Sequence, residues 1–401
     1  MKMKKRILIA IEPIMRGSRV HILMYFLSAV NPLYDKIYVV TREDYENRLL
    51  DELMKKYDIE NVEYVRSVNI GNAWIKKLNC KEFKCVKSSV ESIINNLREN
   101  EIADVIFMAI DDYFVPFLIS SFTWSLKKIS RCFFIRYRVY YATRSLKSKV
   151  KQALVFAGIF YLLFFKKMRM LNFDERIERK KNLLYNYTNK ITTLPDPWDG
   201  EYDKVERTVA RTRLNIKEDS FVIALIGRQN QRKGFPFILK NIHEILKVNN
   251  VVILISGKIE NEYEEKLLLD IIKNYEKRII YIPDYLSEQD IVYSYAAADV
   301  ILLPYSFDFS FSSGVLARAC AAGVPVIASS HGLVGERVKR YKIGLVFEYE
   351  DVKKLLECIN KLINNKKLLE ELQHNCSIYK QITSLTQFKS KVKNIFIDDK
   401  E

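Results

Sequence analysis

The N-terminal half of the chain alternates short apolar runs with segments whose polar residues recur at helical spacing. Runs that are apolar throughout are typical of parallel strands covered by helices on both faces. The pattern predicts strands at Ile7–Ile11, Lys36–Thr41, Val62–Val65, Asp104–Ile110 and Met168–Phe173. It predicts helices at Val20–Val30, Arg42–Tyr57 and Glu82–Asn100.

The C-terminal half repeats this alternation with clearer boundaries. Ser287 stands before an apolar helix with Asp290 in its first turn, which is a typical helix start. Strands are predicted at Phe221–Ile226, Val251–Ser256, Ile279–Ile282, Val300–Leu303 and Val324–Ala328. Helices are predicted at Phe235–Lys247, Asn261–Tyr275, Ser287–Ala298, Ser313–Ala322, Asp351–Asn364 and Lys367–Tyr379.

Two runs of strand–helix alternation predict an α/β protein with two Rossmann-like, doubly wound domains. Leu194–Asp199 carries two prolines after a predicted strand, and the charged stretch 200–220 is the predicted linker. We therefore expect domains at residues 1–200 and 201–384, and a C-terminal helix within 385–401 that packs back on the first domain. Ligands of open α/β sheets bind at the carboxyl ends of the strands, so we expect the site in a cleft between the two domains.

Charge is distributed unevenly along the 401 residues, whose formal net charge is +16. Residues 1–200 hold 35 basic and 22 acidic residues, whereas residues 201–401 hold 30 and 27. The basic first half predicts an anionic partner, although lysines that only keep the protein soluble are the alternative. Six scattered cysteines and four scattered histidines predict no metal site. No nucleic-acid-binding motif is found, and we expect no nucleic acid partner.

The most specific local motif is Gly227-Arg-Gln-Asn-Gln-Arg-Lys-Gly234, which joins a predicted strand to a predicted helix. A glycine at the strand end allows a tight turn, and Arg228 and Lys233 then project beside a helix N-terminus. Arginine forks, lysine charges and helix N-termini all favour phosphate. The motif therefore predicts a phosphate site, with a solvated basic loop as the alternative.

Two acidic residues, Asp111 and Asp112, follow the predicted strand Asp104–Ile110 and are therefore placed at a carboxyl end. Asp111 is the candidate general base, and the alternative is that one of the two carboxylates caps a turn.

A basic, aromatic segment covers residues 113–173, which contain twelve Lys and Arg and no Asp or Glu. Its longest apolar run, Ala153–Phe165, has thirteen residues, fewer than the roughly twenty needed to cross a bilayer. Basic and aromatic residues together favour docking to an anionic membrane surface. We therefore expect a cytoplasmic protein that associates peripherally with the inner face of the membrane through residues 113–173. A packed core helix at 153–165 is the alternative.

The C-terminal half resembles family 4 glycosyltransferases, the glycosyl transferases group 1 with the GT-B fold. The motif Gly227–Gly234 resembles the family's diphosphate-binding loop, and Leu194–Asp199 its interdomain I-P-N-P-V-D. Residues 296–304, 313–328 and 344–347 resemble its A-D-V-x-x-x-P, A-x-G-x-P-V-I-A and G-x-L-V segments. In the first half the likeness is limited to a pattern that includes Gly17 and Ser18. The resemblance implies a nucleoside-diphosphate-sugar donor, a retaining reaction and no metal.

One departure concerns the family's two glutamates, which are eight residues apart. Their positions hold Ser310 and Arg318 here. The local sequence is similar to a P-Y-x(n)-S-G-V variant. Either Asp308 would replace one of the two acids, or the hydroxyls of Ser312 or Ser313 and the backbone N–H groups at the helix start, Gly314 and Val315, would bind the sugar or phosphate. Arg318 would pair with phosphate or form a structural ion pair. The remaining candidate donor-binding residues are Gly17, Gly227, Arg228, Lys233, Pro283 and Asp284, with Arg228 and Lys233 also stabilising the leaving group.

These observations predict a glycosyltransferase that moves a sugar from a nucleoside diphosphate to a lipid-linked or surface-polysaccharide acceptor. Two alternatives remain open. One is a catalytically inactive GT-B protein that binds a nucleotide or a polyanion, and the other is a nucleotide-sugar epimerase.

Overall fold

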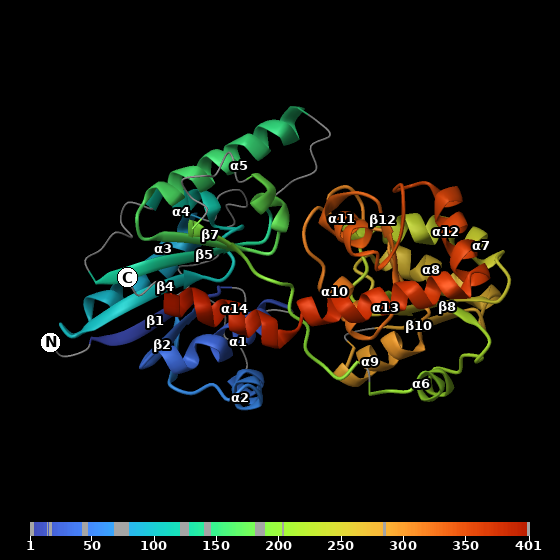
Figure 1. Ribbon diagram of the computed structural model, residues 1–401, viewed down its shortest axis with the longest axis horizontal. Helices are drawn as coiled ribbons and strands as arrows, with labels where there is room; N and C mark the ends of the chain where they lie inside the picture. Colours follow the sequence, from blue (N-terminus) through green and yellow to red (C-terminus); the bar gives the residue numbers. More distant parts are fainter. Residues whose placement is uncertain are drawn as a thin grey trace. The chain divides into compact units, whose positions relative to one another are not determined.

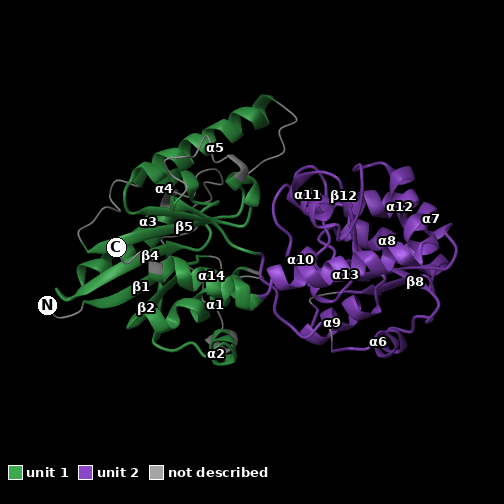
Figure 2. Ribbon diagram, in the orientation of Figure 1, with its two compact units in different colours: residues 1–139, 143–195, 385–401 green, residues 140–142, 196–384 purple. Residues whose placement is uncertain are grey.

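The computed structural model describes residues 4–13, 15, 18–41, 47–67, 80–120, 128–139, 146–180, 189–202, 204–283 and 286–398. The chain forms two compact units (Figure 2). Unit 1 contains the described residues up to 139, from 146 to 195 and from 385 onward. Unit 2 contains those from 196 to 384. The chain therefore passes from one unit to the other after Pro195 and again after Ser384.

Unit 1 is built on a parallel sheet of the order β3-β2-β1-β4-β5-β6-β7. Its strands are β1 (Lys5–Ile11), β2 (Lys36–Thr41), β3 (Val62–Arg66), β4 (Glu101–Phe107), β5 (Ile129–Arg136), β6 (Met168–Asn172) and β7 (Ile191–Thr193). Figure 1 shows helices on both faces of this sheet. One face carries α1 (Ser18–Val30), α2 (Asn47–Lys56) and α14 (Leu385–Asp398), and the other α3 (Cys80–Asn95), α4 (Phe114–Ser120) and α5 (Leu146–Phe164). Short 3-10 helices cover Asn31–Leu33 and Glu175–Lys180.

The C-terminal helix α14 completes the core of unit 1, although residues 196–384 of unit 2 separate it in sequence from the rest of that unit. The buried Phe396 ring stacks on Phe133 of β5 with 4.3 Å between centroids, and meets Phe26 of α1 edge-on at 5.4 Å. Aromatic contacts of this kind bury large apolar areas. They attach the end of the chain to the first unit.

Unit 2 repeats the architecture with a parallel sheet of the order β10-β9-β8-β11-β12-β13. Its strands are β8 (Phe221–Ile226), β9 (Val251–Ser256), β10 (Ile279–Ile282), β11 (Val300–Leu303), β12 (Val326–Ser329) and β13 (Gly344–Phe347). One core lies under α6 (Arg207–Arg213), α9 (Glu288–Ala297), α10 (Gly314–Ala321), α11 (Gly332–Tyr341) and α13 (Lys366–Ile382). The other lies under α7 (Phe235–Leu246), α8 (Glu262–Asn274) and α12 (Val352–Asn364). Two doubly wound α/β units are thus confirmed.

In both sheets the strand order reverses beside the first strand, between β1 and β4 in unit 1 and between β8 and β11 in unit 2. Connections leave these two strands toward opposite faces, which opens a crevice at their carboxyl ends. We therefore expect a ligand site of unit 2 in the loops that follow β8 and β11.

The strand expected at Asp104–Ile110 is β4, which begins and ends three residues earlier. It pairs in register with β1 from Lys5 and Glu101 to Ile11 and Phe107, so both strands end together. Met108–Ile110 are buried although they lie beyond the end of the strand. Their apolar side chains therefore extended the sequence pattern of the strand by three residues. Asp111 therefore lies beyond a short buried loop and not directly after the strand.

The sequence pattern missed β5 because one arginine interrupts its apolar run and a second ends it. Both are buried: Arg131 donates to Asp104 of β4 at 2.7 Å, and the Arg136 guanidinium lies over the Phe114 ring, 3.8 Å from its centroid. Buried arginines are tolerated where such partners replace water. Helices α4 and α11 also went unpredicted.

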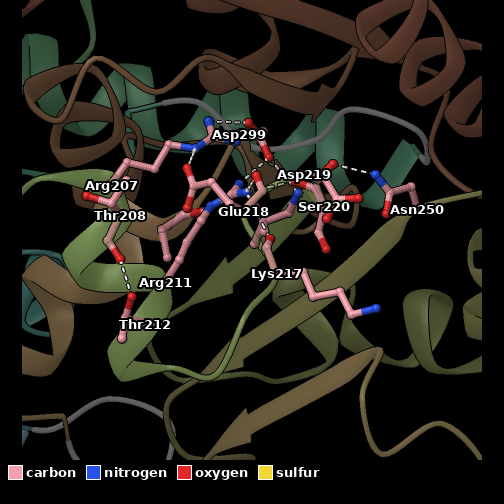
Figure 3. A network of polar contacts seen from close by, with 12 residues as sticks. Arg207, Thr208, Arg211, Thr212, Lys217, Glu218, Asp219, Ser220, Asn250 and Asp299 are labelled. Carbon is pink, nitrogen blue, oxygen red and sulfur yellow. Dashed lines mark hydrogen bonds and ion pairs between the residues drawn. The ribbon is translucent and has the colours of Figure 1, made fainter.

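The expected linker at 200–220 is instead part of unit 2 and contains α6. The fully buried Arg211 of α6 donates to Asp299 at 2.7 Å and to the carbonyl oxygens of Ala297 and Ser220 (Figure 3). Asp299 also accepts from the backbone N–H of Val222 at 2.7 Å. The charges of this stretch therefore serve a buried network that fixes α6 to the sheet.

Candidate functional site

The loop between β8 and α7 has a defined conformation set by its two glycines. Gly227 and Gly234 have φ values of +84° and +75°, which favour glycine. A Cβ on Gly234 would lie 1.7 Å from the carbonyl oxygen of Pro304, so only glycine fits there. Between them, the Asn230 side chain accepts from the backbone N–H of Lys233 at 3.0 Å and caps the 3-10 helix Gln231–Lys233.

This loop is joined to the loop that follows β11. The backbone N–H and the hydroxyl of Ser306 donate to the carbonyl oxygen of Arg232 at 3.0 and 3.1 Å. Together with the approach of Gly234 to Pro304, these bonds bring the two loops into contact where the strand order reverses. Residues 227–234 and 304–318, predicted separately from the sequence, therefore belong to one region.

Three basic residues of the loop between β8 and α7 and one of α10 form what is here called the cation cluster, in which the charges of the three arginines act on the lysine: Arg228, Arg232, Lys233 and Arg318. Lys233 is partly buried, with its Nζ 3.4 Å from the position of a Cβ on Gly227. Burial and the neighbouring charges of Arg228 and Arg318 lower the pKa of Lys233 to about 8. Within the described part of the chain its ammonium has no hydrogen-bond or ion-pair partner. Repelling cations held this close favour an anion among them.

A carboxylate that the sequence analysis missed orients the exposed end of the cluster. Oε1 of Glu260, in the connection from β9 to α8, accepts from Arg228 Nη1 at 3.2 Å and from Asn230 Nδ2 at 3.1 Å. The side chains of Arg228 and Glu260 are 54% and 43% exposed, so the pair is open to solvent and to competition by another anion. Glu260 is 32 residues away from Arg228 in sequence, and no local pattern links them.

Helix α10 carries the fourth cation of the cluster in its last turn, whereas a predicted donor-binding hydroxyl at its N-cap already has a protein partner. Arg318 Nη1 lies 3.6 Å from the position of a Cβ on the exposed Gly314, and its guanidinium lies close enough to Tyr202 to oppose the rise that burial causes in the pKa of that phenol. The buried Ser313 hydroxyl is instead 2.9 Å from the hydroxyl of Tyr305. Ser312 and Val315 are partly buried. Arg318 thus contributes to the cluster, whereas the Ser313 hydroxyl already has a protein partner.

The other predicted donor-binding residues are placed less favourably. Asp308 is exposed and lies close enough to Tyr349 to add to the rise in the pKa of that phenol, which burial mainly causes. Ser310 is buried. Pro283 is exposed just after β10, while Asp284 and Gly17 lie outside the described residues.

Asp111, the candidate base, has a structural role in unit 1. Its two carboxylate oxygens accept from the backbone N–H groups of Tyr137 and Arg138 at 2.8 and 2.9 Å. It therefore joins the loops after β4 and β5. These contacts favour the alternative in which the carboxylate caps a turn, because both of its oxygens already accept a hydrogen bond from the backbone.

Unit 1 has a charged cluster at its own point of strand reversal, which the sequence analysis missed. Arg19 of α1 donates to Asp112 at 2.7 Å and lies 3.5 Å from the fully buried Glu12. Burial lowers the pKa of Arg19, but the two carboxylates outweigh it and the net shift is upward. Glu12 directly follows β1, so its position after an apolar strand was the available signal.

Two features are absent from the described residues. They contain no group of three or more His, Cys, Asp or Glu that would hold a metal ion. None of their helices is both long and apolar enough to cross a membrane.

Comparison with known families identifies the domain that carries the cation cluster. Residues 206–381 match the family model described as glycosyl transferases group 1. Unit 2 is a glycosyl transferases group 1 domain. The match begins at α6 and ends in α13, so it contains the cation cluster and both loops that form it.

Known proteins resemble the chain over different lengths. An uncharacterized glycosyltransferase of Methanocaldococcus jannaschii is 24% identical over 172 residues, which are 42% of this chain and 41% of that protein. The matches to the curated relatives span between 37% and 51% of their length. Anabaena HepE, solved in complex with UDP, superposes with a TM-score of 0.69 over 97% of this chain and 98% of its own, at 14% identity. WaaG, described as a glycosyltransferase involved in lipopolysaccharide biosynthesis, does so with a TM-score of 0.65 over 98% and 99%, at 14% identity. These likenesses establish the GT-B fold of the whole chain.

Proposed function

We propose that this protein is a glycosyltransferase that moves a sugar from a nucleoside-diphosphate donor to a lipid-linked or surface-polysaccharide acceptor. The observation that carries the proposal is the cation cluster, which lies at the carboxyl ends of β8 and β11 in a glycosyl transferases group 1 domain. A diphosphate is the ligand that satisfies several converging cations at once. HepE, with the same fold, was solved with UDP and with UDP-glucose, which supports a uridine nucleotide as the first donor to test.

In this proposal the cluster serves the leaving group. Transfer breaks the bond between the anomeric carbon and a phosphate oxygen, and the electron pair stays on that oxygen. Arg228 and Lys233 stabilise the charge that develops there, and Arg318 adds a third cation from α10. In a retaining transfer the departing diphosphate is itself available to take the proton of the acceptor hydroxyl. Asp111, which is held by two backbone N–H groups, is then not required as the base.

Unit 1 supplies the acceptor side of the proposal. Residues 1–200 carry the excess of basic residues, which suits an anionic glycan or a lipid-linked intermediate at an anionic membrane. The resemblance to WaaG, named for lipopolysaccharide biosynthesis, supports an acceptor of this class. Peripheral association with the inner face of the membrane belongs to the same proposal.

Nucleotide titrations test the donor site. UDP, GDP, ADP and CDP are titrated into the wild-type protein, Arg228→Ala and the control Arg213→Ala. Arg213 is a suitable control because it is 49% exposed and paired with an aspartate, much as Arg228 is 54% exposed and paired with a glutamate. We expect one nucleotide to bind the wild type and Arg213→Ala, and Arg228→Ala to bind it more than about tenfold more weakly.

Turnover separates the transferase from a protein that only binds nucleotides. The protein is incubated with a membrane lipid extract and with a labelled nucleotide sugar that carries the same base as the nucleotide that binds. The labelled sugar that reaches the lipid fraction is then measured. Sugar transfer by the wild type that is lost in Arg228→Ala supports the proposal. Binding without transfer or nucleotide release favours an inactive GT-B protein, a reading suggested by Ser310 and Arg318 in place of two glutamates. Binding of no nucleotide contradicts both.

A further inference from the structure

The outward face of α5 is apolar and exposed. Leu146, Leu154 and Phe164 are 79%, 67% and 76% exposed, and Val150 and Tyr161 about half. At 100° per residue these five positions fall within an arc of about 80°. The opposite face, which contains Val155, Ile159 and Leu162, is buried in unit 1. The helix is therefore apolar on both sides, and only one side has a protein partner within the unit.

Helix α4 packs beside α5 and carries a further exposed apolar side chain. Figure 1 shows α4 and α5 on the same side of the unit 1 sheet. They are in contact, since a Cβ on Gly158 of α5 would lie 2.9 Å from the side chains of Leu118 and Phe114 in α4. Ile119 of α4 is 77% exposed. We call the six exposed side chains the α4–α5 patch: Ile119, Leu146, Val150, Leu154, Tyr161 and Phe164.

The rim of the patch is basic. Lys147 and Lys149 are exposed and fall on opposite sides of the apolar stripe at helical spacing. Lys166 is exposed just beyond the end of the helix. Residues 113–173 contain no Asp or Glu, so nothing in this segment balances these charges. A matching surface is apolar at its centre and anionic at its edge. A second copy of this chain does not fit, because lysines would face lysines.

We propose that the α4–α5 patch inserts into the headgroup–acyl boundary of an anionic bilayer, with α5 lying parallel to the membrane plane. Apolar side chains on one face with lysines at their borders are the features of an interfacial helix. The 19 residues of α5 would lie along about 28 Å of the surface. The inference deepens the membrane part of the proposed function, and it does not depend on the transfer chemistry.

Flotation with lipid vesicles tests the insertion. The full chain is mixed with vesicles of phosphatidylcholine alone or with added phosphatidylglycerol. The test variant is Leu154→Glu/Phe164→Glu. The control is Tyr263→Glu/Ile378→Glu, two apolar residues of unit 2 that are 74% and 49% exposed. We expect binding of the wild type and the control to anionic vesicles, and at least about tenfold weaker partitioning of the test variant.

Three outcomes each overturn the proposal. Equal binding of the test variant and the wild type means that charge alone holds the protein at the membrane. Failure of the wild type to bind anionic vesicles excludes the membrane as the partner. A wild-type dimer that the test variant converts to a monomer, without vesicle binding, assigns the patch to a second copy. Melting temperature checks that both variants fold. If the protein binds anionic vesicles but no nucleotide, the proposed function fails and this inference stands.

Discussion

Replacing Lys233 with methionine tests whether the cation cluster binds a diphosphate. The substitution keeps an unbranched side chain of similar length, so it removes the charge with little change in packing. The Lys233 ammonium is partly buried beside Arg228 and Arg318 and has no hydrogen-bond or ion-pair partner in the described part of the chain. Its loss therefore breaks no hydrogen bond or ion pair of the described residues, and an effect on nucleotide binding reports on the ligand.

The expected loss of affinity follows from the strength of one charged contact. A hydrogen bond to a charged group contributes about 1.5–3 kcal/mol. This corresponds to an increase of about 10- to 150-fold in the Kd of the nucleoside diphosphate. The free protein responds in the opposite direction. Below pH 8 the ammonium is charged in both the folded and the unfolded chain, and its lowered pKa means that folding disfavours that charge. Lys233→Met without nucleotide should therefore melt no lower than the wild type at pH 7.

The pH dependence of binding provides a second measurement. With its pKa lowered to about 8, Lys233 loses its proton as the pH rises above that value, and the nucleotide must then bind a neutral amine or recruit a proton. Wild-type affinity should fall above pH 8, whereas the affinity of Lys233→Met should change less over the same range. Calorimetric titrations between pH 7 and pH 9 measure both, with the exposed Lys240→Met as the control for a lost surface charge.

The reasoning is refuted if Lys233→Met binds the nucleotide within about twofold of the wild type at pH 7, or if Lys240→Met loses as much affinity. Equal pH profiles in the wild type and Lys233→Met would show that another group titrates.

Three further predictions concern the frame of the site. Asp299→Asn leaves the fully buried Arg211 without its counter-charge and should destabilise the protein by about 3–5 kcal/mol in urea unfolding; less than 1 kcal/mol would mean that the network is not a structural requirement. Gly234→Ala places a Cβ 1.7 Å from the carbonyl oxygen of Pro304 and should abolish nucleotide binding. The control Gly323→Ala has a similar φ and no atom within 4 Å of the new Cβ, so it should lower the free energy of unfolding by only about 1 kcal/mol and keep nucleotide binding. Asp111→Ala should destabilise the fold by about 1–3 kcal/mol through two lost hydrogen bonds and reduce kcat less than tenfold; a fall of a hundredfold or more in kcat in the folded variant would identify it as the base after all.

The sequence alone determined the elements whose signals are local. Strands β2, β8, β9, β10 and β11 begin and end where the apolar runs do, and Ser287 caps α9 as its position indicated. The loop from Gly227 to Gly234 was identified for the same reason, because glycine spacing and phosphate-seeking side chains are contained within eight consecutive residues. Hydrophobic periodicity and turn chemistry act over a few residues, so they can be read without the fold.

The tertiary structure decided what depends on distant partners. The charged stretch around Arg211 became a helix that buries this arginine, because Asp299, 88 residues later, neutralises its charge. Strand β5 is stabilised despite its arginines because Asp104 lies on the next strand. Glu260 joined the site only when separate loops met, and the apolar stripe of α5 proved exposed because a single face of that helix packs on unit 1. Ion pairing and burial are set by neighbours in space, and a one-dimensional pattern does not contain them.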